Sequence, residues 1–422
     1  MVGNINFPQF SCSFRLFSKP KDDQQSNFRS QSFSQDSFNS SFSSRSSLPP
    51  SISAVTPPST TLHHDCILTI KPNSSHILSL TLAGNHLFSG LSNSQIHRWV
   101  THPTSSDEEF ISVQCKSAIK CLQIFNENVL ISAHQDHKIK IWKVNEVGIK
   151  IVTTLPTLKD RLTKILFTKN YVTNRRHKKL TWVHHNDAVS SLAVSGDKSL
   201  IYSASWDRSF KVWRSSDFKC LESVSNAHDD AINAIVLSDE GFVYTGSADK
   251  KIKVWRFNQR DRKHDLIDSL VHHKSVVNAL GYDDNLSVLI SGACSGVMIA
   301  SERNFSGGGD GGHMLVVGAL LGHKKAILCV RIVGELVCSG SADKTVRLWR
   351  RTVGKSCYSC LGVLEGHCGP VKCLTVAAES SGDGDGDGDG DGREYMVYSG
   401  SLDGDIKVWK VWVPFAMEND KS

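Results

Sequence analysis

A chain of 422 residues with 40% hydrophobic residues is long enough for one large domain with a real core and tails. Its formal net charge of +6 is mild for this length and argues against a dedicated nucleic-acid binder. Twelve cysteines stand at irregular spacing, and residues 1–20 lack the apolar stretch of a secretory signal, which indicates reduced thiols in a cytosolic or nuclear protein.

The chain begins with a segment, residues 1–63, that is rich in Ser, Gln, Asn and Pro. This composition cannot bury enough apolar surface to offset chain entropy, so we expect a disordered tail. A phosphorylated regulatory arm and a plastid targeting peptide are two sharper interpretations, and Asp22, Asp23 and Asp36 disfavour the second. A short second tail is expected at residues 414–422.

Between the tails, residues 64–413 repeat one frame, in which a Trp follows an Asp or Asn by six positions. The runs around these frames, such as INAIVL and IKVWRF, alternate in character and predict four short strands per unit. A further unit, SGACSGVMIAS, fits with Ser295 and Ser301 in the two places, so we expect seven copies of a structural unit. The other six pairs are Asn93/Trp99, Asp136/Trp142, Asp207/Trp213, Asp249/Trp255, Asp343/Trp349 and Asp403/Trp409.

Two insertions lengthen the second and the seventh unit. Residues 150–180 are basic and contain LKDRLTKILF, a candidate amphipathic helix. Residues 380–393 alternate Asp and Gly without the spacing or closing Glu of an EF-hand, so we expect a flexible acidic loop there. We expect both insertions on the face that carries the loops between first and second strands and between third and fourth strands. The basic insertion ends in the cluster Arg175, Arg176, Lys178 and Lys179.

This pattern resembles the WD40 family, and seven units resemble its seven-bladed β-propeller, an all-β fold. The resemblance covers residues 65–412. It implies that a strand from the start of the first repeat completes the last blade, and DCILTIK (65–71) is the candidate to pair with the strand that holds Trp409. Closure of this kind hides the edges of the sheets.

A His precedes the first strand in five units, whereas Asn73 and Cys115 take its place in the first two. A Ser, a His and an Asp together could indicate a hydrolase triad, but such a triad is single and lies in a cleft. The resemblance implies instead a buried hydrogen-bond network in four blades. In this network the Asp accepts hydrogen bonds from the His and from backbone N–H groups, and the Trp indole N–H donates to a Ser or Thr. In the sixth blade this hydroxyl residue is Ser339 or Ser341. The expected sets are His185, Asp207, Trp213; His228, Asp249, Trp255; His323, Asp343, Trp349; and His367, Asp403, Trp409.

Blades one, two and five depart from this network. Blade five keeps only His273, blade one has Asn93 and no His, and blade two has Cys115 in the place of His. Because a missing member leaves a buried polar group without its partner, we expect these three blades to be softer than the others.

No cofactor or metal site is expected. The chain has no P-loop, no GxGxxG after a strand and no HExxH, and the CxxC at Cys357 and Cys360 lacks a second close pair. The longest apolar run, 314–321, is far too short to span a bilayer, so no membrane contact is expected.

Binding surfaces are expected instead on the rim formed by the residues that precede each turn Asp. Trp206 stands out because an exposed large aromatic is a typical interface anchor, and Gln135 is a second candidate. Packing of Trp206 against the neighbouring blade is the structural alternative. The seven rim residues are Ser92, Gln135, Trp206, Ala248, Cys294, Ala342 and Leu402.

The basic insertion and the start of the third unit resemble the plant JINGUBANG-type WD40 proteins, as does the Ser-rich leader. This implies a plant regulatory protein of cytosol and nucleus that acts through protein contacts. We therefore expect a monomeric, non-enzymatic scaffold that binds other proteins. Two alternatives stay open: a ubiquitin-ligase substrate receptor, although the usual W-D-x-R signature is missing, and binding of nucleic acid or an acidic partner through the basic insertion.

Overall fold

The computed structural model describes residues 62–72, 75–101, 111–165, 171–173, 179–304, 312–351, 358–378 and 392–415. These residues are almost entirely β-strand, with one helix, α1 (Leu158–Ile165). The two expected tails and the Asp-Gly run lie almost wholly outside the described residues.

The strands form seven four-stranded antiparallel sheets, called blades here and numbered in chain order. In blades one to six the four strands follow one another along the chain. Blade one contains β2 (Ile77–Ala83), β3 (His86–Leu91), β4 (Gln95–Val100) and β5 (Ile111–Gln114); blade two contains β6 (Ile119–Asn126), β7 (Val129–His134), β8 (Ile139–Asn145) and β9 (Gly148–Leu155); blade three contains β12 (Val189–Val194), β13 (Leu200–Ser205), β14 (Phe210–Arg214) and β15 (Cys220–Val224).

The remaining blades follow the same plan. Blade four contains β16 (Ile232–Leu237), β17 (Phe242–Ser247), β18 (Ile252–Asn258) and β19 (Lys263–Leu270); blade five contains β20 (Val277–Asp283), β21 (Val288–Ala293), β22 (Met298–Asn304) and β23 (His313–Leu320); blade six contains β24 (Ile327–Val333), β25 (Leu336–Ser341), β26 (Val346–Arg351) and β27 (Tyr358–Leu364); blade seven contains β28 (Val371–Ala378), β29 (Gly392–Ser401), β30 (Ile406–Pro414) and β1 (His63–Ile70).

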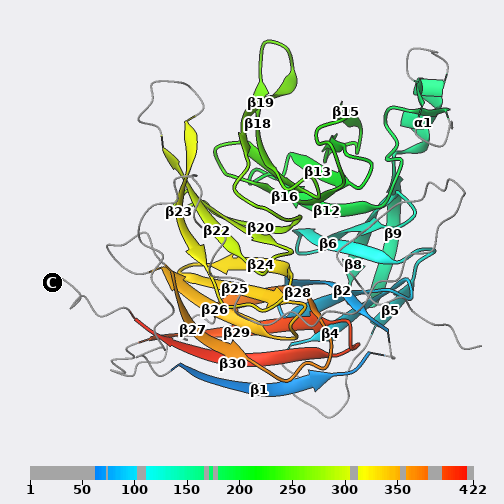
Figure 1. Cartoon of the computed structure of the whole chain (residues 1–422). Coiled ribbons are helices and arrows are strands. Elements are labelled where there is room, and N and C mark those ends of the chain that lie inside the picture. The colour runs from blue at the N-terminus through cyan, green and yellow to red at the C-terminus, as the bar shows by residue number, and fades with distance from the viewer. Residues whose placement is uncertain are drawn as a thin grey trace, which may run out of the picture. The chain divides into compact units, whose positions relative to one another are not determined.

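The first strands of neighbouring blades contact one another around a closed ring. Their order is β2, β6, β12, β16, β20, β24, β28 and back to β2, and Figure 1 shows these strands around the centre of the domain. The predicted seven-bladed β-propeller is therefore confirmed.

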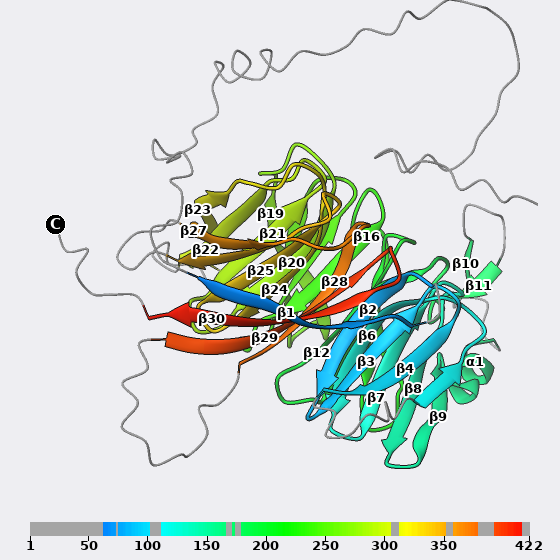
Figure 2. The ribbon, with the colours of Figure 1, turned by 90° about the horizontal axis from the view of Figure 1, so that it is seen from below.

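One blade is built from both ends of this ring. β1 pairs antiparallel with β30, from His63↔Trp412 to Ile70↔Ile406. Both views show the blue β1 alongside the red β30 (Figures 1 and 2). This pairing is the one that the sequence predicted for residues 65–71, and it leaves no gap between the first and the last blade.

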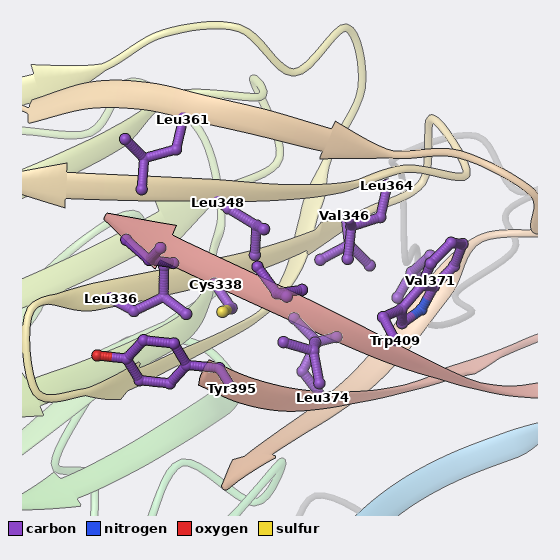
Figure 3. Packing of buried hydrophobic residues seen from close by; sticks show 13 residues of the cluster. Leu336, Cys338, Val346, Leu348, Leu361, Leu364, Val371, Leu374, Tyr395 and Trp409 are labelled. Carbon is purple, nitrogen blue, oxygen red and sulfur yellow. The ribbon is translucent and has the colours of Figure 1, made fainter. Parts of the chain in front are cut away.

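A hydrophobic cluster fills each space between neighbouring blades. Figure 3 shows the cluster between blades six and seven, where Leu336 and Leu348 of blade six face Leu374, Tyr395 and Trp409 of blade seven. Burying one such side chain contributes about 1.5–3 kcal/mol, so these clusters supply most of the stability that holds the ring together.

Two glycines show how closely the blades approach one another. A Cβ at Gly292 of β21 would stand 2.5 Å from Cγ2 of Ile327, and a Cβ at Gly400 of β29 would stand 2.6 Å from Cγ2 of Ile77. In both cases the Ile is the first residue of the next blade's first strand. The second strand therefore carries Gly at this position because a larger side chain would push the neighbouring blade away.

The expected position of the basic insertion is wrong in one respect. Residues 150–155 belong to β9, the fourth strand of blade two, which pairs with β8 from Ile139↔Leu155 to Asn145↔Gly148. The insertion therefore follows the fourth strand and leaves beside the turn between β7 and β8, on the face opposite to the one expected. The run Ile151–Thr154 consists of β-branched residues, which favour a β-strand even though the residues that flank it are basic.

The rest of the insertion contains α1 and a small hairpin, β10 (Tyr171–Thr173) and β11 (Lys179–Thr181). The helix occupies part of the predicted LKDRLTKILF segment and lies close to β9 in both views (Figures 1 and 2). The Asp-Gly run connects β28 to β29, the first and second strands of blade seven, as its register predicted.

Candidate functional site

Four blades contain a His, a hydroxyl residue, an Asp and a Trp in one hydrogen-bonded chain, called a tetrad here. In blade four, Trp255 Nε1 donates to Thr245 Oγ1 at 2.9 Å, and Thr245 Oγ1 lies 2.8 Å from His228 Nε2. His228 Nδ1 lies 2.8 Å from Asp249 Oδ2. Because the indole can only donate and the carboxylate only accept, each hydroxyl donates to Nε2 and each Nδ1–H to the Asp.

The same chain recurs in three other blades with nearly the same distances. In blade six the hydroxyl is that of Ser339, while Ser341 bonds the Lys325 carbonyl, so the structure separates the two alternatives. The three tetrads are His185, Ser203, Asp207 and Trp213 in blade three; His323, Ser339, Asp343 and Trp349 in blade six; and His367, Ser399, Asp403 and Trp409 in blade seven.

The tetrads connect the rim turns to the sheet interior and are closed to substrates. Their His side chains are at most 1% exposed. In blade four the Asp249 carboxylate also accepts the backbone N–H groups of Asp229 and Lys251. Each Asp therefore ties the connection that precedes the first strand to the turn between the second and third strands, which is a structural role.

The tetrad hydrogen bonds keep the aspartates ionised. Burial alone would raise the pKa of Asp249, but the hydrogen bond and charge of His228 and the N–H groups of Lys251 and Asp229 lower it to about 2. A carboxyl pKa that is lower in the folded state stabilises the protein above about pH 4, and this contribution is lost as the pH falls toward 2.

Blade two contains a substitute histidine that the sequence pattern did not identify. His134, on β7, lies with Nε2 2.7 Å from Ser132 Oγ, which accepts the indole N–H of Trp142. Its Nδ1 lies 3.1 Å from the Ser117 carbonyl oxygen, so a backbone group replaces the Asp. A Ser or Thr stands ten residues before the Trp in every complete tetrad, and this spacing was the signal that could have located the network.

The rest of blade two and blade one also differ from the tetrads. Asp136, which fits the repeated frame, forms a half-buried ion pair with Lys138 at 3.4 Å. In blade one, Trp99 Nε1 donates to Ser89 Oγ at 3.0 Å, and the buried His97 contacts Gln95. In blade five, His273 keeps its bond to Ser291 at 2.7 Å. In these three networks His97, His134 and His273 bond to a side-chain amide, a hydroxyl or a backbone carbonyl.

Substitution of a tetrad Asp is expected to cost more stability than substitution of its counterpart in blade one. Asp249→Ala removes the acceptor of three hydrogen bonds and leaves buried His228 without its partner, so we expect a loss of about 3 kcal/mol. Asn93 is exposed, and its side chain exchanges hydrogen bonds with its neighbour Gln95, so Asn93→Ala should cost less than about 1 kcal/mol. Thermal unfolding of both variants measures the order; an equal or reversed ranking would contradict the structural role of the tetrad.

The seven predicted rim residues occupy equivalent positions. Each donates its backbone N–H to a carbonyl just before the first strand of its own blade, as Gln135 does to Ala118 and Trp206 does to Ala188, both at 3.0 Å. They define one face of the propeller, called the rim face here. Gln135 is exposed and Trp206 is half-buried.

Trp206 also contacts a residue of the neighbouring blade. The ammonium group of Lys120, on β6, lies 5.0 Å from the centroid of the Trp206 ring. Trp206 therefore packs against the neighbouring blade and keeps some exposed surface, and its role as an interface anchor stays a prediction.

The basic cluster lies largely beyond the described residues. Arg175, Arg176 and Lys178 are outside them, and Lys179 opens β11. The described part of the insertion is anchored by Asp160, whose buried Oδ2 accepts the N–H of Cys220 on β15 at 3.2 Å. In the part of the chain that the structure describes, no three His, Cys, Asp or Glu side chains gather as around a metal ion. No helix there has the length and apolar character of a membrane span.

The comparisons with known families agree with this geometry. The model of the WD40 family, described as "WD domain, G-beta repeat", matches residues 177–214, 218–256, 315–350 and 358–410. Each matched segment contains the His, Asp and Trp of one tetrad. The family pattern and the hydrogen-bonded network therefore fall on the same four blades.

Short stretches match curated proteins. A stretch of 92 residues is 32% identical to the WD repeat-containing protein pop2 of Schizosaccharomyces pombe and covers 22% of this chain and 12% of that protein. A stretch of 63 residues is 41% identical to Pre-mRNA-processing factor 19 homolog 2 of Arabidopsis thaliana and covers 14% of this chain and 12% of that protein. The chain thus matches about an eighth of the length of these relatives.

A solved structure matches most of the domain. The WD40 beta propeller domain of Doa1 superimposes with a TM-score of 0.59, covering 82% of this chain and 96% of that chain at 18% identity. At this identity the likeness concerns the fold alone.

Proposed function

Since four of its blades are WD40 repeats, we propose that this chain is a non-enzymatic scaffold that binds other proteins through the rim face. The observation that carries this proposal is the contrast between two sets of polar groups. The His, Ser or Thr, and Asp groups that could do chemistry are buried and bonded to one another, whereas the rim turns around Gln135 and Trp206 face solvent on a rigid ring.

We further propose a plant regulatory role in cytosol and nucleus, with the protein acting as a monomer. This finer proposal is supported by the resemblance of the basic insertion and the Ser-rich leader to the plant JINGUBANG-type proteins. A role as the substrate receptor of a ubiquitin ligase is the alternative within the same class, and the missing W-D-x-R signature disfavours it.

Proximity labelling in cells tests the rim face. Trp206→Ala is expected to reduce labelling of rim-face partners several-fold, because a partly exposed aromatic side chain is a typical binding anchor. Trp412→Ala is the matched control, since Trp412 is also half-buried but lies on β30, where it contacts His63 of β1. If both variants fold and give the partner set of the parent protein, the rim face is not the docking surface.

The exposed side of α1, in the basic insertion, is a second candidate docking surface. Asp160 fixes α1 to blade three, while Leu158 and Leu162, one turn apart, are 74% and 66% exposed. An acidic partner or nucleic acid would bind here through the neighbouring cations. The double variant Leu158→Ala and Leu162→Ala, compared in the same labelling experiment, separates this element from Trp206.

A further inference from the structure

Blade seven extends further than blade six on the face opposite to the rim face. In blade six the second and third strands pair as far as Leu336↔Arg350, next to the tetrad Trp. In blade seven the same two strands continue well beyond the tetrad Trp, to Gly392↔Pro414. The added run VWV (411–413) consists of β-branched and aromatic residues, which favour a strand. β29 and β30 therefore form a wall beside the end of blade six.

A cavity of about 70 Å³ lies between this wall and blade six. The turn between β24 and β25 approaches the wall closely, since a Cβ at Gly334 would stand 3.7 Å from Nη1 of Arg393 and 3.8 Å from Oη of Tyr395. Arg350 of blade six donates Nη1–H to the carbonyl oxygen of Pro414 and so joins the two blades at the cavity. Figure 3 shows Tyr395 at this end of the core between the two blades.

The polar groups that line the cavity are of both signs. Arg350 and Arg393 contribute two guanidinium groups, Tyr395 contributes a phenol hydroxyl, and Glu335 contributes a carboxylate. In the part of the chain that the structure describes, no ion pair joins either guanidinium group to a carboxylate, that of Glu335 included. The cavity therefore offers hydrogen-bond donors and an acceptor to one ligand.

The rest of the lining is apolar. Leu336 and Val413 belong to the buried core between blades six and seven, whereas Phe415 is 54% exposed. A ligand held by the charged groups would also cover the exposed ring of Phe415, which favours a ligand with an apolar part.

The size of the cavity restricts the ligand to a small molecule. A water molecule occupies about 10–15 Å³ of such a cavity, so 70 Å³ has room for on the order of five non-hydrogen atoms. The α-carbon, the ammonium nitrogen and the carboxylate of a free amino acid together have about that number. A cofactor of ordinary size needs roughly 300 Å³ or more and does not fit.

We propose that this cavity binds a free α-amino acid with an apolar side chain. The carboxylate of the ligand lies between Arg350 and Arg393 and accepts from the hydroxyl of Tyr395, since all three groups can donate. Its ammonium group donates to Glu335, and its side chain covers Phe415. The cavity is on the face opposite to the rim face, so this binding site is additional to the proposed scaffold surface.

A phosphate group fits the cavity less well than an amino acid. It has a similar number of atoms and also suits two guanidinium groups. Its negative charge would nevertheless stand close to the carboxylate of Glu335, which it cannot compensate. A zwitterion uses the same carboxylate as the partner of its ammonium group.

Saturation-transfer NMR with leucine as the probe tests the site on the full chain. We expect saturable binding with a dissociation constant on the order of 1 mM, as is typical of a ligand with few atoms. Two analogues should bind about tenfold more weakly or not at all. These are 4-methylpentanoate, which lacks the ammonium group, and isoamylamine, which lacks the carboxylate.

Variants of the charged groups identify the cavity as the binding site. Arg393→Gln and Glu335→Gln should each weaken leucine binding about fivefold or more, because each removes one charged partner. Both side chains are exposed, so the melting temperature should stay close to that of the parent. Arg214→Gln is the matched control: Arg214 follows the tetrad Trp of blade three as Arg350 does in blade six, and its loss should change the affinity less than about twofold.

The two carboxylate outcomes separate an amino-acid site from a plain anion site. Absence of saturable leucine binding, equal binding of 4-methylpentanoate, or an unchanged affinity in Glu335→Gln would overturn the proposal. Inorganic phosphate that binds more tightly than leucine, and binds still more tightly to Glu335→Gln, would overturn it as well. The labelling of rim-face partners does not depend on any of these results.

Discussion

Deletion of residues 62–70 is expected to unfold the propeller or convert it to oligomers. This change removes β1, which pairs with β30 along its length and contributes Ile70 to the core between blades seven and one. The lost hydrogen bonds, at about 1 kcal/mol each, and the lost burial sum to on the order of 5–10 kcal/mol. That is comparable to the whole stability of a domain.

Thermal unfolding and size-exclusion chromatography with light scattering measure this effect. The exposed edge of β30 should also recruit other chains, so aggregation is expected at concentrations where the parent is monomeric. A variant that begins at Leu62 keeps β1 and serves as the control. A chain without β1 that stayed monomeric and melted with the parent would show that the ring does not depend on this closure.

Lowering the pH from 7 to 5 is expected to destabilise the protein through three buried histidines of blades one, two and five. Burial lowers the pKa of His97, His134 and His273 to about 4, with help from the charge of Lys140 at His134 and from His272 at His273. The unfolded chain binds protons as the pH falls below 6.5, while the folded chain does not. Stability is therefore complete above pH 6.5 and is lost as the pH falls toward 4.

At pH 5 each of these histidines should have cost about 2 kcal/mol, since 1.5 pH units below 6.5 correspond to that free energy. Urea denaturation at pH 7 and pH 5 measures the difference, in a range where the tetrad aspartates remain ionised. His273→Gln should reduce the loss by about 2 kcal/mol, whereas His313→Gln, at an exposed position, should not. An unchanged loss in His273→Gln would show that the pH dependence has another source.

The number of blades could be predicted because the part of each unit that makes the tetrad has a constant length. The six residues from Asp to Trp span one turn and one strand. An inserted residue in either would break the hydrogen bonds that the Asp makes at the turn and the Trp makes in the sheet. The position of β1 was expected from the resemblance to the WD40 family, in which a strand from the start of the first repeat completes the last blade.

The substitute network of blade two could not be predicted from that spacing. His134 comes from a strand rather than from the connection before it, so it lies outside the repeated frame. The face of the basic insertion was missed because residues 150–155, counted with the insertion, belong to the strand β9, which continues to Leu155.

The closure of blade seven also determines the order in which the protein can be completed. β1 leaves the ribosome first and its partner β30 last, so blades one to six can form during synthesis while the circle remains open. Until Pro414 has emerged, the nascent chain exposes an unpaired edge at each end, and any prematurely terminated product keeps both. Translation through β30 is therefore a condition for a closed fold, and a chain that stops before β30 differs from one that contains it by its open sheet edges.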